Sequence, residues 1–411
     1  MFNSKNIEIF KANFIEWKIF IIIAFQKHSL VNYILNLTIE QQISLLIVLI
    51  AFLIQIIYYL IIYIRPSVWK RKNITDEEKP LSVIICAQNE YVNLKKHLPK
   101  ILEQKYSNYE VIVVNDCSED NTEMLLGELE QKYSHLRHTS IEKDRKFTHG
   151  KKLAVTIGIK SAKNNYLVFT DADCYPVSDL WLKEISKSYV VNKQIVLGYG
   201  GYEKQKGFLN RIIRFDTFFI AMQYLGFALA GRPYMGVGRN MSYLKQLFFA
   251  GSGFSKHYNL LSGDDDLFIN DNASKHNTTV VISKDSIIRS VPKTTWSDWA
   301  KQKKRHITTG KYYKKGDKFF LSFEPFSRFM FYAGLIALFI FKFNIIYIGT
   351  IFAVRMLIQL IVIKLNMNKL SEKGFLLLVP FFDIFLPFIY LLFYRSNRKN
   401  SRKRMLYNKI Q

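Results

Sequence analysis

Two aspartates, Asp171 and Asp173, follow the apolar run of residues 166–170 and precede a turn at Pro176. Residues two apart in an extended chain point to the same side, so we expect the two carboxylates to lie close together. Converging carboxylates commonly hold Mg²⁺ or Mn²⁺, and such a cation can hold the phosphates of a nucleotide. The alternative is an acidic turn open to water at the end of a strand, because so short a motif recurs by chance.

The elements that would position this pair are short apolar, β-branched runs that alternate with polar amphipathic stretches. The runs cover residues 81–87, 109–115 and 166–170. The pattern predicts an α/β fold with a parallel sheet that is covered by helices on both faces. Glu90 and Asp116 follow the first two runs, and such sheets bind ligands beyond the carboxyl ends of their strands. We therefore expect both acids near the aspartate pair, with helix N-capping as the alternative for each.

A second acidic cluster, SGDDDLFIN, covers residues 262–270 and supplies three adjacent carboxylates. Crowding of like charges should raise the pKa of at least one of them toward that of a useful general base, for which we favour Asp265. The alternative is an acidic turn that caps a helix from Leu267, a role that suits Asp264 or Asp266. Lys151, at another predicted helix start, could meet a phosphate together with backbone N–H groups.

Two zones of the chain are apolar enough for a membrane. Residues 43–64 contain no charged side chain and are long enough to cross a bilayer core of about 30 Å. The basic residues from Arg65 to Lys72 predict that the following domain is cytoplasmic. The second zone has predicted helical segments at 326–341, 343–363 and 374–394. Three crossings would place the basic tail outside, so we expect the last segment not to be a simple span. Its Asp383 lies between Pro380 and Pro387, which indicates a broken or re-entrant segment, or a face turned toward protein.

The predicted division of the chain has five parts. They are an interfacial N-terminal segment (1–40), a transmembrane helix (41–66), a cytoplasmic domain (78–325), a C-terminal transmembrane region (326–395) and a basic tail (396–411). Within the cytoplasmic domain, residues 207–231 are apolar but too charged for a span, and fit an interfacial or a core helix.

Composition narrows the partners and the compartment. The formal net charge of +25 favours anionic membrane lipids and a pyrophosphate group as partners rather than nucleic acid, because no nucleic-acid-binding motif accompanies it. The three cysteines lack metal-ligand spacing and are expected to be reduced thiols, in keeping with a cytoplasmic domain.

Four stretches occur in an order that is typical of one family. They are VVNDCSED (113–120), FTDADCYP (169–176), GVGRNMSY (236–243) with the acidic cluster, and QKKRH (302–306). Their order and spacing resemble those of the membrane-bound family 2 glycosyltransferases, the group that contains bacterial hyaluronan, cellulose and chitin synthases. The resemblance covers roughly residues 78–325. It implies a GT-A-type, Rossmann-like nucleotide-sugar-binding domain with a mostly parallel sheet, flanked by transmembrane helices.

The resemblance also implies roles for individual residues. Asp116 would contact the nucleotide base, Asp171 and Asp173 would hold the diphosphate through Mg²⁺ or Mn²⁺, and Asp265 would be the general base. Gln302 and Arg305 match the Gln-x-x-Arg-Trp element of processive members, whose tryptophan is replaced here by His306. With the residue pattern, the expected donor-side contacts are Glu90, Asp116, Lys151, Asp171 and Asp173; Gln302, Arg305 and His306 lie on the acceptor and diphosphate side, and Asp264 lies beside the base.

The expected activity is inverting transfer of a sugar from a nucleotide diphosphate donor, with UDP the expected nucleotide, to a hydroxyl of a lipid-linked or polysaccharide acceptor. Attack from the face opposite the leaving group inverts the anomeric carbon. The expected location is the bacterial inner membrane, with the catalytic domain in the cytoplasm. Two alternatives are a processive polysaccharide synthase of the same fold and a membrane scaffold that binds nucleotide sugars without turnover.

Overall fold

The computed structural model describes residues 37–71, 77–142, 150–260 and 262–407, with side chains through residue 393. The predicted interfacial segment at 1–40 and the side chains of the basic tail therefore lie almost wholly outside the described residues. The chain divides into two compact units. One contains the residues up to Gln55 together with Glu324–Arg355, and the other contains Ile56–Phe323 and the chain from Met356 onward.

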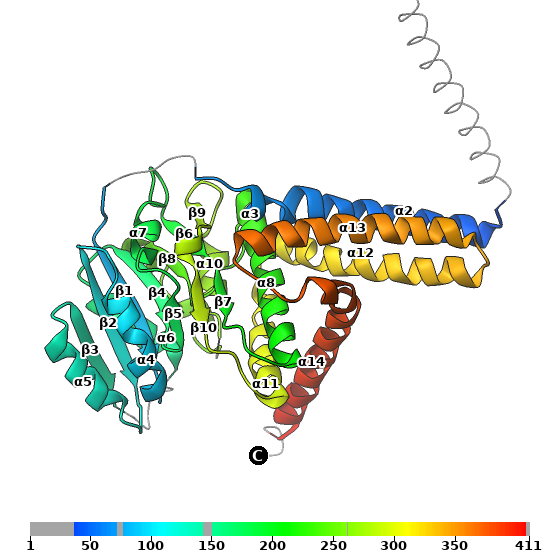
Figure 1. Ribbon diagram of the computed structural model, residues 1–411. Coiled ribbons are helices and arrows are strands. Elements are labelled where there is room, and N and C mark those ends of the chain that lie inside the picture. Colours follow the sequence, from blue (N-terminus) through cyan, green and yellow to red (C-terminus); the bar gives the residue numbers. More distant parts are fainter. Residues whose placement is uncertain (1–36, 72–76, 143–149, 261, 408–411) are drawn as a thin grey trace, which may run out of the picture. The chain divides into compact units, whose positions relative to one another are not determined.

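The second unit contains a seven-stranded sheet with the strand order β3-β2-β1-β4-β8-β6-β9 (Figure 1). The strands are β1 (Leu81–Ala87), β2 (Tyr109–Asp116), β3 (Leu136–Ile141), β4 (Tyr166–Asp171), β6 (Ile195–Gly198), β8 (Met241–Leu244) and β9 (Thr278–Val281). Strands β1 to β4 are parallel, and only β8 runs antiparallel to its neighbours β4 and β6. The predicted mostly parallel α/β sheet is confirmed.

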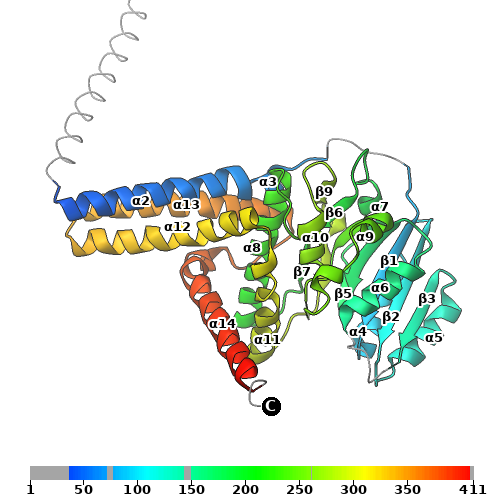
Figure 2. The ribbon, with the colours of Figure 1, turned by 180° about the vertical axis from the view of Figure 1, so that it is seen from behind.

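Helices cover both faces of the first four strands (Figure 1, and from behind in Figure 2). Helices α4 (Tyr91–Leu102) and α5 (Thr122–Lys132) pack with Val83 and Val111 in one buried cluster. Helix α6 (Lys151–Ser161) packs on the opposite face of β1 and β2, where the alternate residues such as Ile84 point. It lies close to this face, because a Cβ on its Gly158 would be 2.6 Å from Ile84 Cγ2. Because alternate residues of a strand face opposite sides, strands covered twice are apolar throughout, which explains the continuous apolar runs.

A second, three-stranded sheet has the order β5-β10-β7. Its strands are β5 (Cys174–Pro176), β7 (Gly200–Tyr202) and β10 (Ile288–Ser290). The sequence did not predict this sheet, because strands of three residues are too short to show an alternating pattern. The remaining helices of the domain are α7 (Trp181–Ser186), α9 (Lys245–Ala250), α10 (Asp266–Asn272) and α11 (Trp296–Ile307).

Helix α8 (Phe208–Leu229) is long and apolar enough to cross a membrane, contrary to the expectation that its charges exclude a span. However, 72% of its most apolar window is buried inside the protein. A Cβ on Gly226 would lie 2.6 Å from the carbonyl oxygen of Ile62, so the two helices cross closely only because this residue is glycine. Two of its charged residues are buried in ion pairs, Arg214 with Glu372 and Asp216 with Lys303, and Arg211 is exposed. In this structure α8 is a core helix.

Four further helices are long and apolar enough to span a membrane. They are Ile39–Val68, which joins α2 (Ile39–Ile57), a π-helical turn (Tyr58–Tyr63) and α3 (Arg65–Val68); α12 (Lys315–Ile340); α13 (Ile345–Lys369); and the first part of α14 (Val379–Tyr407), at Leu376–Phe393. In the first compact unit, Val48, Phe331 and Leu338 are buried against one another. Residues such as Ile336 (61% exposed) face outward, as expected for a surface in contact with lipid.

The segment predicted not to be a simple span forms α14, a continuous helix with Pro387 inside it. Asp383 accepts a hydrogen bond from Gln359 Nε2 of α13 (2.9 Å). Of the two explanations for this acid, a broken helix is wrong and a face turned toward protein is confirmed. Helix α14 also packs against α11, with Phe393 5.6 Å from the ring centroid of Trp299. Because α14 packs against α11 within the same unit, it is not surrounded by lipid alone, which is consistent with the expectation that it is not a simple span.

Candidate active site

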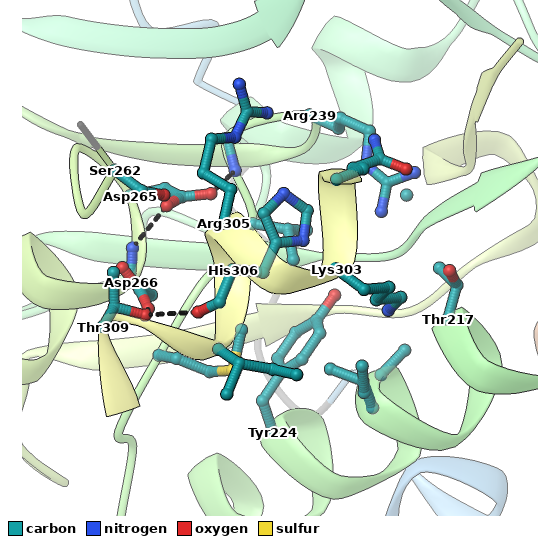
Figure 3. Close-up of a pocket in the computed structure, with 18 of the residues that line it drawn as sticks. Thr217, Tyr224, Arg239, Ser262, Asp265, Asp266, Lys303, Arg305, His306 and Thr309 are labelled. Carbon is teal, nitrogen blue, oxygen red and sulfur yellow. Dashed lines mark hydrogen bonds between the residues drawn. The ribbon is translucent and has the colours of Figure 1, made fainter. Parts of the chain in front are cut away.

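A cavity of about 570 Å³ lies in the second unit, beyond the carboxyl end of β4 (Figure 3). This volume is within the range of small-molecule binding sites. One part of its wall is polar and charged, and another part is apolar and aromatic, with Ile220, Ala221 and Tyr224 from α8 and Leu321 from α12. The predicted site residues in its wall are Lys151, Asp171, Asp173, Asp264, Asp265, Gln302, Arg305 and His306.

The predicted aspartate pair converges as expected. Ligand atoms of Asp171, Asp173 and Cys174 all lie within 4.8 Å of one another. Asp173 Oδ2 accepts a hydrogen bond from Ser290 Oγ of β10 (3.0 Å), and its Oδ1 accepts one from the Cys174 thiol (3.3 Å). Burial and the two carboxylates raise the pKa of Cys174 well above its ordinary value, so it keeps its proton. Two carboxylates beside a protonated thiol fit a hard cation such as Mg²⁺ or Mn²⁺ and not a thiolate-bound metal.

Lys151 stands at the first turn of α6, between the two acidic clusters. Its Nζ lies 2.6 Å from Asp171 Oδ1 and 3.4 Å from Asp264 Oδ2. Burial opposes its charge, but the carboxylates of Asp171, Asp264 and Asp265 raise the pKa of Lys151 well above its ordinary value. The same contact lowers the pKa of Asp171 against the effect of burial, whereas burial and Asp171 raise the pKa of Asp173. Lys151, which the sequence assigned to phosphate, bridges the two acidic clusters here.

The acidic cluster ends in helix α10, and its N-cap is Asp265. Asp265 Oδ1 accepts the backbone N–H of Asp266 (2.8 Å), and its Oδ2 accepts the backbone N–H of Gly238 (2.9 Å). Capping was the alternative given for Asp264 or Asp266; the N-cap is Asp265 instead, and Asp266 Oδ1 accepts the backbone N–H of Leu267 (2.8 Å) in the same turn. Burial, Asp264 and Asp266 together raise the pKa of Asp265 to about 7. A carboxylate with this pKa is suited to general-base catalysis near neutral pH.

The other two acids of the cluster have different surroundings. Asp264 is 8% exposed, lines the cavity and pairs with Lys151. Asp266 accepts hydrogen bonds from the hydroxyls of Tyr313 (2.7 Å) and Thr309 (2.5 Å), which follow α11. Burial raises the pKa of Asp266. Asp266 therefore ties the acidic cluster to the end of α11, and Asp264 and Asp265 remain as candidates for the base.

Helix α11 places the QKKRH stretch in the cavity wall. The Thr295 side chain caps its first turn by accepting the backbone N–H of Asp298 (3.2 Å). Gln302 Nε2 donates to the hydroxyl of Tyr202 (3.1 Å), and Lys303 pairs with the buried Asp216. Figure 3 shows Arg305, His306 and Lys303 among the side chains that surround the cavity. The neighbouring basic groups also stabilise α11, because cations at a helix C-terminus complement its dipole.

His306 presents a neutral ring to the cavity. The crowded protein surroundings of the ring, together with the positive charges of Lys303 and Arg305, lower its pKa to about 3, although the side chain stays accessible from the cavity. The ring therefore carries no charge near neutral pH and offers a small polar face.

Glu90 and Asp116 lie at the same edge of the sheet, but not in the wall of this cavity. Cys86 is level with Val114 of β2 and with Asp171 of β4, so the three strands end side by side. Asp116 is 6% exposed, and its Oδ1 has no hydrogen-bond partner among the described residues. Glu90 accepts a hydrogen bond from Asn93 (2.6 Å), and burial raises its pKa. Both acids remain in position to contact a ligand that extends along this edge.

Arg239 and Tyr202 are two of the cavity residues that were not predicted as part of the site. Arg239 belongs to the GVGRNMSY stretch, which served only to identify the family resemblance, and its Cζ lies 4.5 Å from the ring centroid of Tyr202. A single arginine after two glycines in an otherwise uncharged stretch was the available signal for Arg239. Tyr202 gave no signal, because it ends a strand of three residues.

Comparisons with known proteins identify the domain. The family model described as Glycosyl transferase family 2 matches residues 82–248. The poly-beta-1,6-N-acetyl-D-glucosamine synthase of Staphylococcus aureus is 31% identical over 119 residues, which are 29% of this chain and 28% of that protein. Glycosyltransferase AglE of Haloferax volcanii is 34% identical over 105 residues, which are 25% of this chain and 33% of that protein. The chain thus spans a third or less of these curated relatives.

Among solved structures, the mannosyltransferase PcManGT from Pyrobaculum calidifontis, described in complex with GDP-Man and Mn²⁺, is similar with a TM-score of 0.54. The similarity covers 81% of this chain and 99% of that one, at 16% sequence identity, and shows a shared fold. The family match includes the aspartate pair and Arg239 but ends before the acidic cluster and α11. Sheet topology, family match and structural similarity together show that the chain carries a family 2 glycosyltransferase domain of the GT-A fold.

Proposed function

We propose that the protein is an inverting glycosyltransferase that moves a sugar from a nucleoside diphosphate donor, a UDP-sugar, to a hydroxyl of a lipid-linked or polysaccharide acceptor at the membrane. One observation carries this proposal: a single cavity joins the aspartate pair, the acidic cluster and the end of α11. These three groups are the parts that such a reaction needs, namely a cation site, a base and positive charge for the leaving group.

On the donor side, Asp171 and Asp173 would hold Mg²⁺ or Mn²⁺. When bound, the cation neutralises charge on the departing diphosphate. Arg305 adds positive charge from the opposite element, and its effect on the pKa of Asp171 indicates that it lies close to the pair. The nucleoside would lie along the sheet edge beyond β1 and β2, near Glu90 and Asp116. The expectation of UDP rests on the resemblance to hyaluronan, cellulose and chitin synthases.

On the acceptor side, Asp265 would remove the proton from the attacking hydroxyl. The bond between the anomeric carbon and the diphosphate breaks as the bond to the acceptor oxygen forms, and the proton passes to the carboxylate. Each oxygen of Asp265 accepts one backbone N–H, and a carboxylate offers about four lone-pair sites, so acceptor capacity remains. The apolar wall from α8 is suited to the lipid part of an acceptor, and the other membrane-length helices of the described residues would keep the site at the bilayer.

The test is transfer by the full chain in membrane vesicles supplied with radiolabelled UDP- and GDP-sugars, with Mn²⁺ or with a chelator. We expect one donor to label a lipid or polysaccharide fraction only when the cation is present. Binding of a nucleotide sugar without turnover by any donor would support the scaffold alternative instead. The absence of both nucleotide-sugar binding and sugar transfer would overturn the proposal.

A processive synthase is the second candidate, because a curated relative is named as a synthase of a polysaccharide. His306 separates the two. In the processive synthases that this chain resembles, a tryptophan at this position stacks on the acceptor sugar, and the smaller, more polar ring of histidine is a weaker platform. We therefore propose addition of one or a few sugars.

His306→Trp should lengthen the product, because a larger aromatic face holds the acceptor while the next unit is added. The measurement is the size distribution of radiolabelled product from membranes of each variant. His276→Trp is the matched control, since His276 is exposed and lies outside the cavity. A wild-type product that is already a high-molecular-weight polymer would contradict the prediction.

The domain at 78–325 is proposed to be cytoplasmic, as the basic flank after residue 64 predicts. Asn108 is exposed, so an Asn108→Cys variant should react with a membrane-impermeant maleimide only after cells are permeabilised. The parent chain controls for its own cysteines, of which Cys174 is buried and Cys86 and Cys117 are partly buried. Labelling of intact cells at Asn108→Cys would show that the domain lies outside.

A further inference from the structure

Arg239 projects from a segment whose backbone is fixed on both sides of it. Gly238 donates its backbone N–H to Asp265 Oδ2 (2.9 Å). The Asn240 side chain, which is 1% exposed, donates to two backbone carbonyl oxygens at 2.9 Å and 2.8 Å and accepts a hydrogen bond from Trp181 Nε1 (3.1 Å). The side chain of Arg239 therefore begins at a rigid point in the cavity wall.

The guanidinium group of Arg239 stacks on an aromatic ring but has an N–H donor without an acceptor. It lies over the ring of Tyr202, with Cζ 4.5 Å from the centroid, and the Tyr202 hydroxyl in turn accepts a hydrogen bond from Gln302. Its Nη1 is shielded from water and has no hydrogen-bond acceptor among the described residues. A stacked guanidinium presents its N–H donors at the edge, and a buried charged donor without an acceptor is unfavourable. The edge of Arg239 is thus prepared for an acceptor that enters the cavity.

The other cations of the cavity are used differently. Lys151 bridges Asp171 and Asp264, and Lys303 pairs with Asp216. Among the lysines and arginines that line the cavity in the described part of the chain, only Arg239 and Arg305 lack an ion pair within 4.0 Å. Arg239 nevertheless lies near the cation site: Tyr202, over which it stacks, is paired in register with Ser290, and Ser290 Oγ donates a hydrogen bond to Asp173 Oδ2 (3.0 Å). Figure 3 shows Arg239 and Arg305 among the side chains around the same cavity.

We propose that Arg239 binds the diphosphate of the donor directly, as a second positive contact beside the cation held by Asp171 and Asp173. This inference rests on the proposed function, since a nucleotide sugar is the ligand that would bring a diphosphate to this cavity. The planar fork of arginine matches two oxygens of a phosphate group, and such charge-assisted bonds are stronger than neutral ones. Arg239 would meet the same phosphates on the substrate and on the released nucleotide.

The competing role is charge balance, in which Arg239 only offsets the negative charge of the aspartate pair. The two roles predict different nucleotide affinities at saturating Mn²⁺. If Arg239 only balances charge, its removal leaves the pair more negative, so Mn²⁺ alone should bind more tightly and nucleotide affinity at saturating Mn²⁺ should stay unchanged. If Arg239 binds the diphosphate, nucleotide affinity falls even when Mn²⁺ is saturating.

The experiment measures binding to the purified full chain in detergent, first of Mn²⁺ alone and then of UDP, UMP, GDP and GMP at saturating Mn²⁺. In Arg239→Gln we expect the affinity for the diphosphate that binds the wild type to fall about 10- to 10²-fold, as for loss of hydrogen bonds to a charged group. The affinity for the matching monophosphate should change less than threefold. Arg239→Lys, which keeps the charge but not the fork, should recover part of the loss.

Arg232→Gln is the matched control. Arg232 also lies 4.5 Å over an aromatic ring, that of Phe320, but it pairs with Asp317 outside the cavity. Its nucleotide affinities should equal those of the wild type. Unchanged diphosphate affinity in both Arg239→Gln and Arg239→Lys would overturn the inference and leave the proposed function intact. Failure of the wild type to bind any of the four nucleotides would instead count against the proposed function.

Discussion

Asp171→Ala should reduce sugar transfer by about 10³-fold or more, because stabilisation of leaving-group charge by a divalent cation is worth several kcal/mol. Asp171 shares its site with Asp173, and their ligand atoms lie within 4.8 Å of each other. Removal of one carboxylate leaves the cation with one protein ligand of the pair. It also frees Lys151, whose Nζ lies 2.6 Å from Asp171 Oδ1, to bind Asp264 alone. Both changes weaken the cation site.

The measurement is initial transfer rate against Mn²⁺ concentration, together with binding of Mn²⁺ in the absence of nucleotide. Asp171→Asn is the companion variant, because the amide keeps the shape of the side chain but not its charge. Asp179→Ala is the control: Asp179 is half-exposed, pairs with Lys105 at 2.7 Å and lies outside the cavity. Near-normal turnover of Asp171→Ala at limiting Mn²⁺ would show that the pair does not hold the cation.

The first half of the sheet could be predicted because its strands are buried on both faces. Strands β1 and β2 lie between α4 and α5 on one side and α6 on the other, so most residues of each run are apolar. The parallel arrangement of these strands was enough to predict that the acids lie together at the carboxyl edge of the sheet. The antiparallel β8 and the sheet β5-β10-β7 were not predicted, since their pairing depends on partners far away in the sequence.

The candidate site, too, could be predicted only where its residues are close together in the sequence. Asp171 and Asp173 are two residues apart, so local geometry predicted that they converge. Spacing in the sequence could not show that α11 reaches the same cavity, and only the family resemblance linked the two. Arg239 was missed because one arginine in a loop has no periodic pattern, and its importance depends on Tyr202 beneath it.

Helix α8 shows why charge in the sequence could not decide between an interfacial helix and a core helix. Arg214 and Asp216 made the segment look too charged for a span and left an interfacial helix and a core helix equally open. Their partners are Glu372, which is 158 residues from Arg214 in the chain, and Lys303 of α11. A charge in a sequence carries no sign of whether a distant residue neutralises it, and buried charges are tolerated only when paired.

Asp265→Asn should lower the transfer rate by about 10² to 10⁴, which is the usual contribution of a general base. The asparagine Oδ1 can accept only one of the two backbone N–H groups that bind Asp265, those of Asp266 and Gly238, so one of these contacts is lost. UDP affinity at saturating Mn²⁺ should fall far less than the transfer rate, which separates loss of the base from loss of the site. Asp179→Asn, the same chemical change at a surface ion pair, should leave both quantities unaltered.

The pH dependence gives an independent readout of the base. The pKa of Asp265 is raised to about 7, and only its deprotonated form can accept the hydroxyl proton. The wild-type rate should therefore rise with pH through about 7 and then level off, because protonation below this value removes the base. This limb should be absent in Asp265→Asn and present in Asp179→Asn.

Asp264 is the only neighbour that could replace Asp265 in this argument. It lines the cavity and pairs with Lys151, whereas Asp266 is held by Tyr313 and Thr309 at the end of α11. If Asp265 is the base, Asp264→Asn should lose less activity and keep the limb near pH 7. A large loss in Asp264→Asn, with Asp265→Asn still active, would assign the base to Asp264 and leave Asp265 as the cap of α10. Equal losses, with the limb absent from both variants, would show that the two carboxylates titrate as one coupled pair.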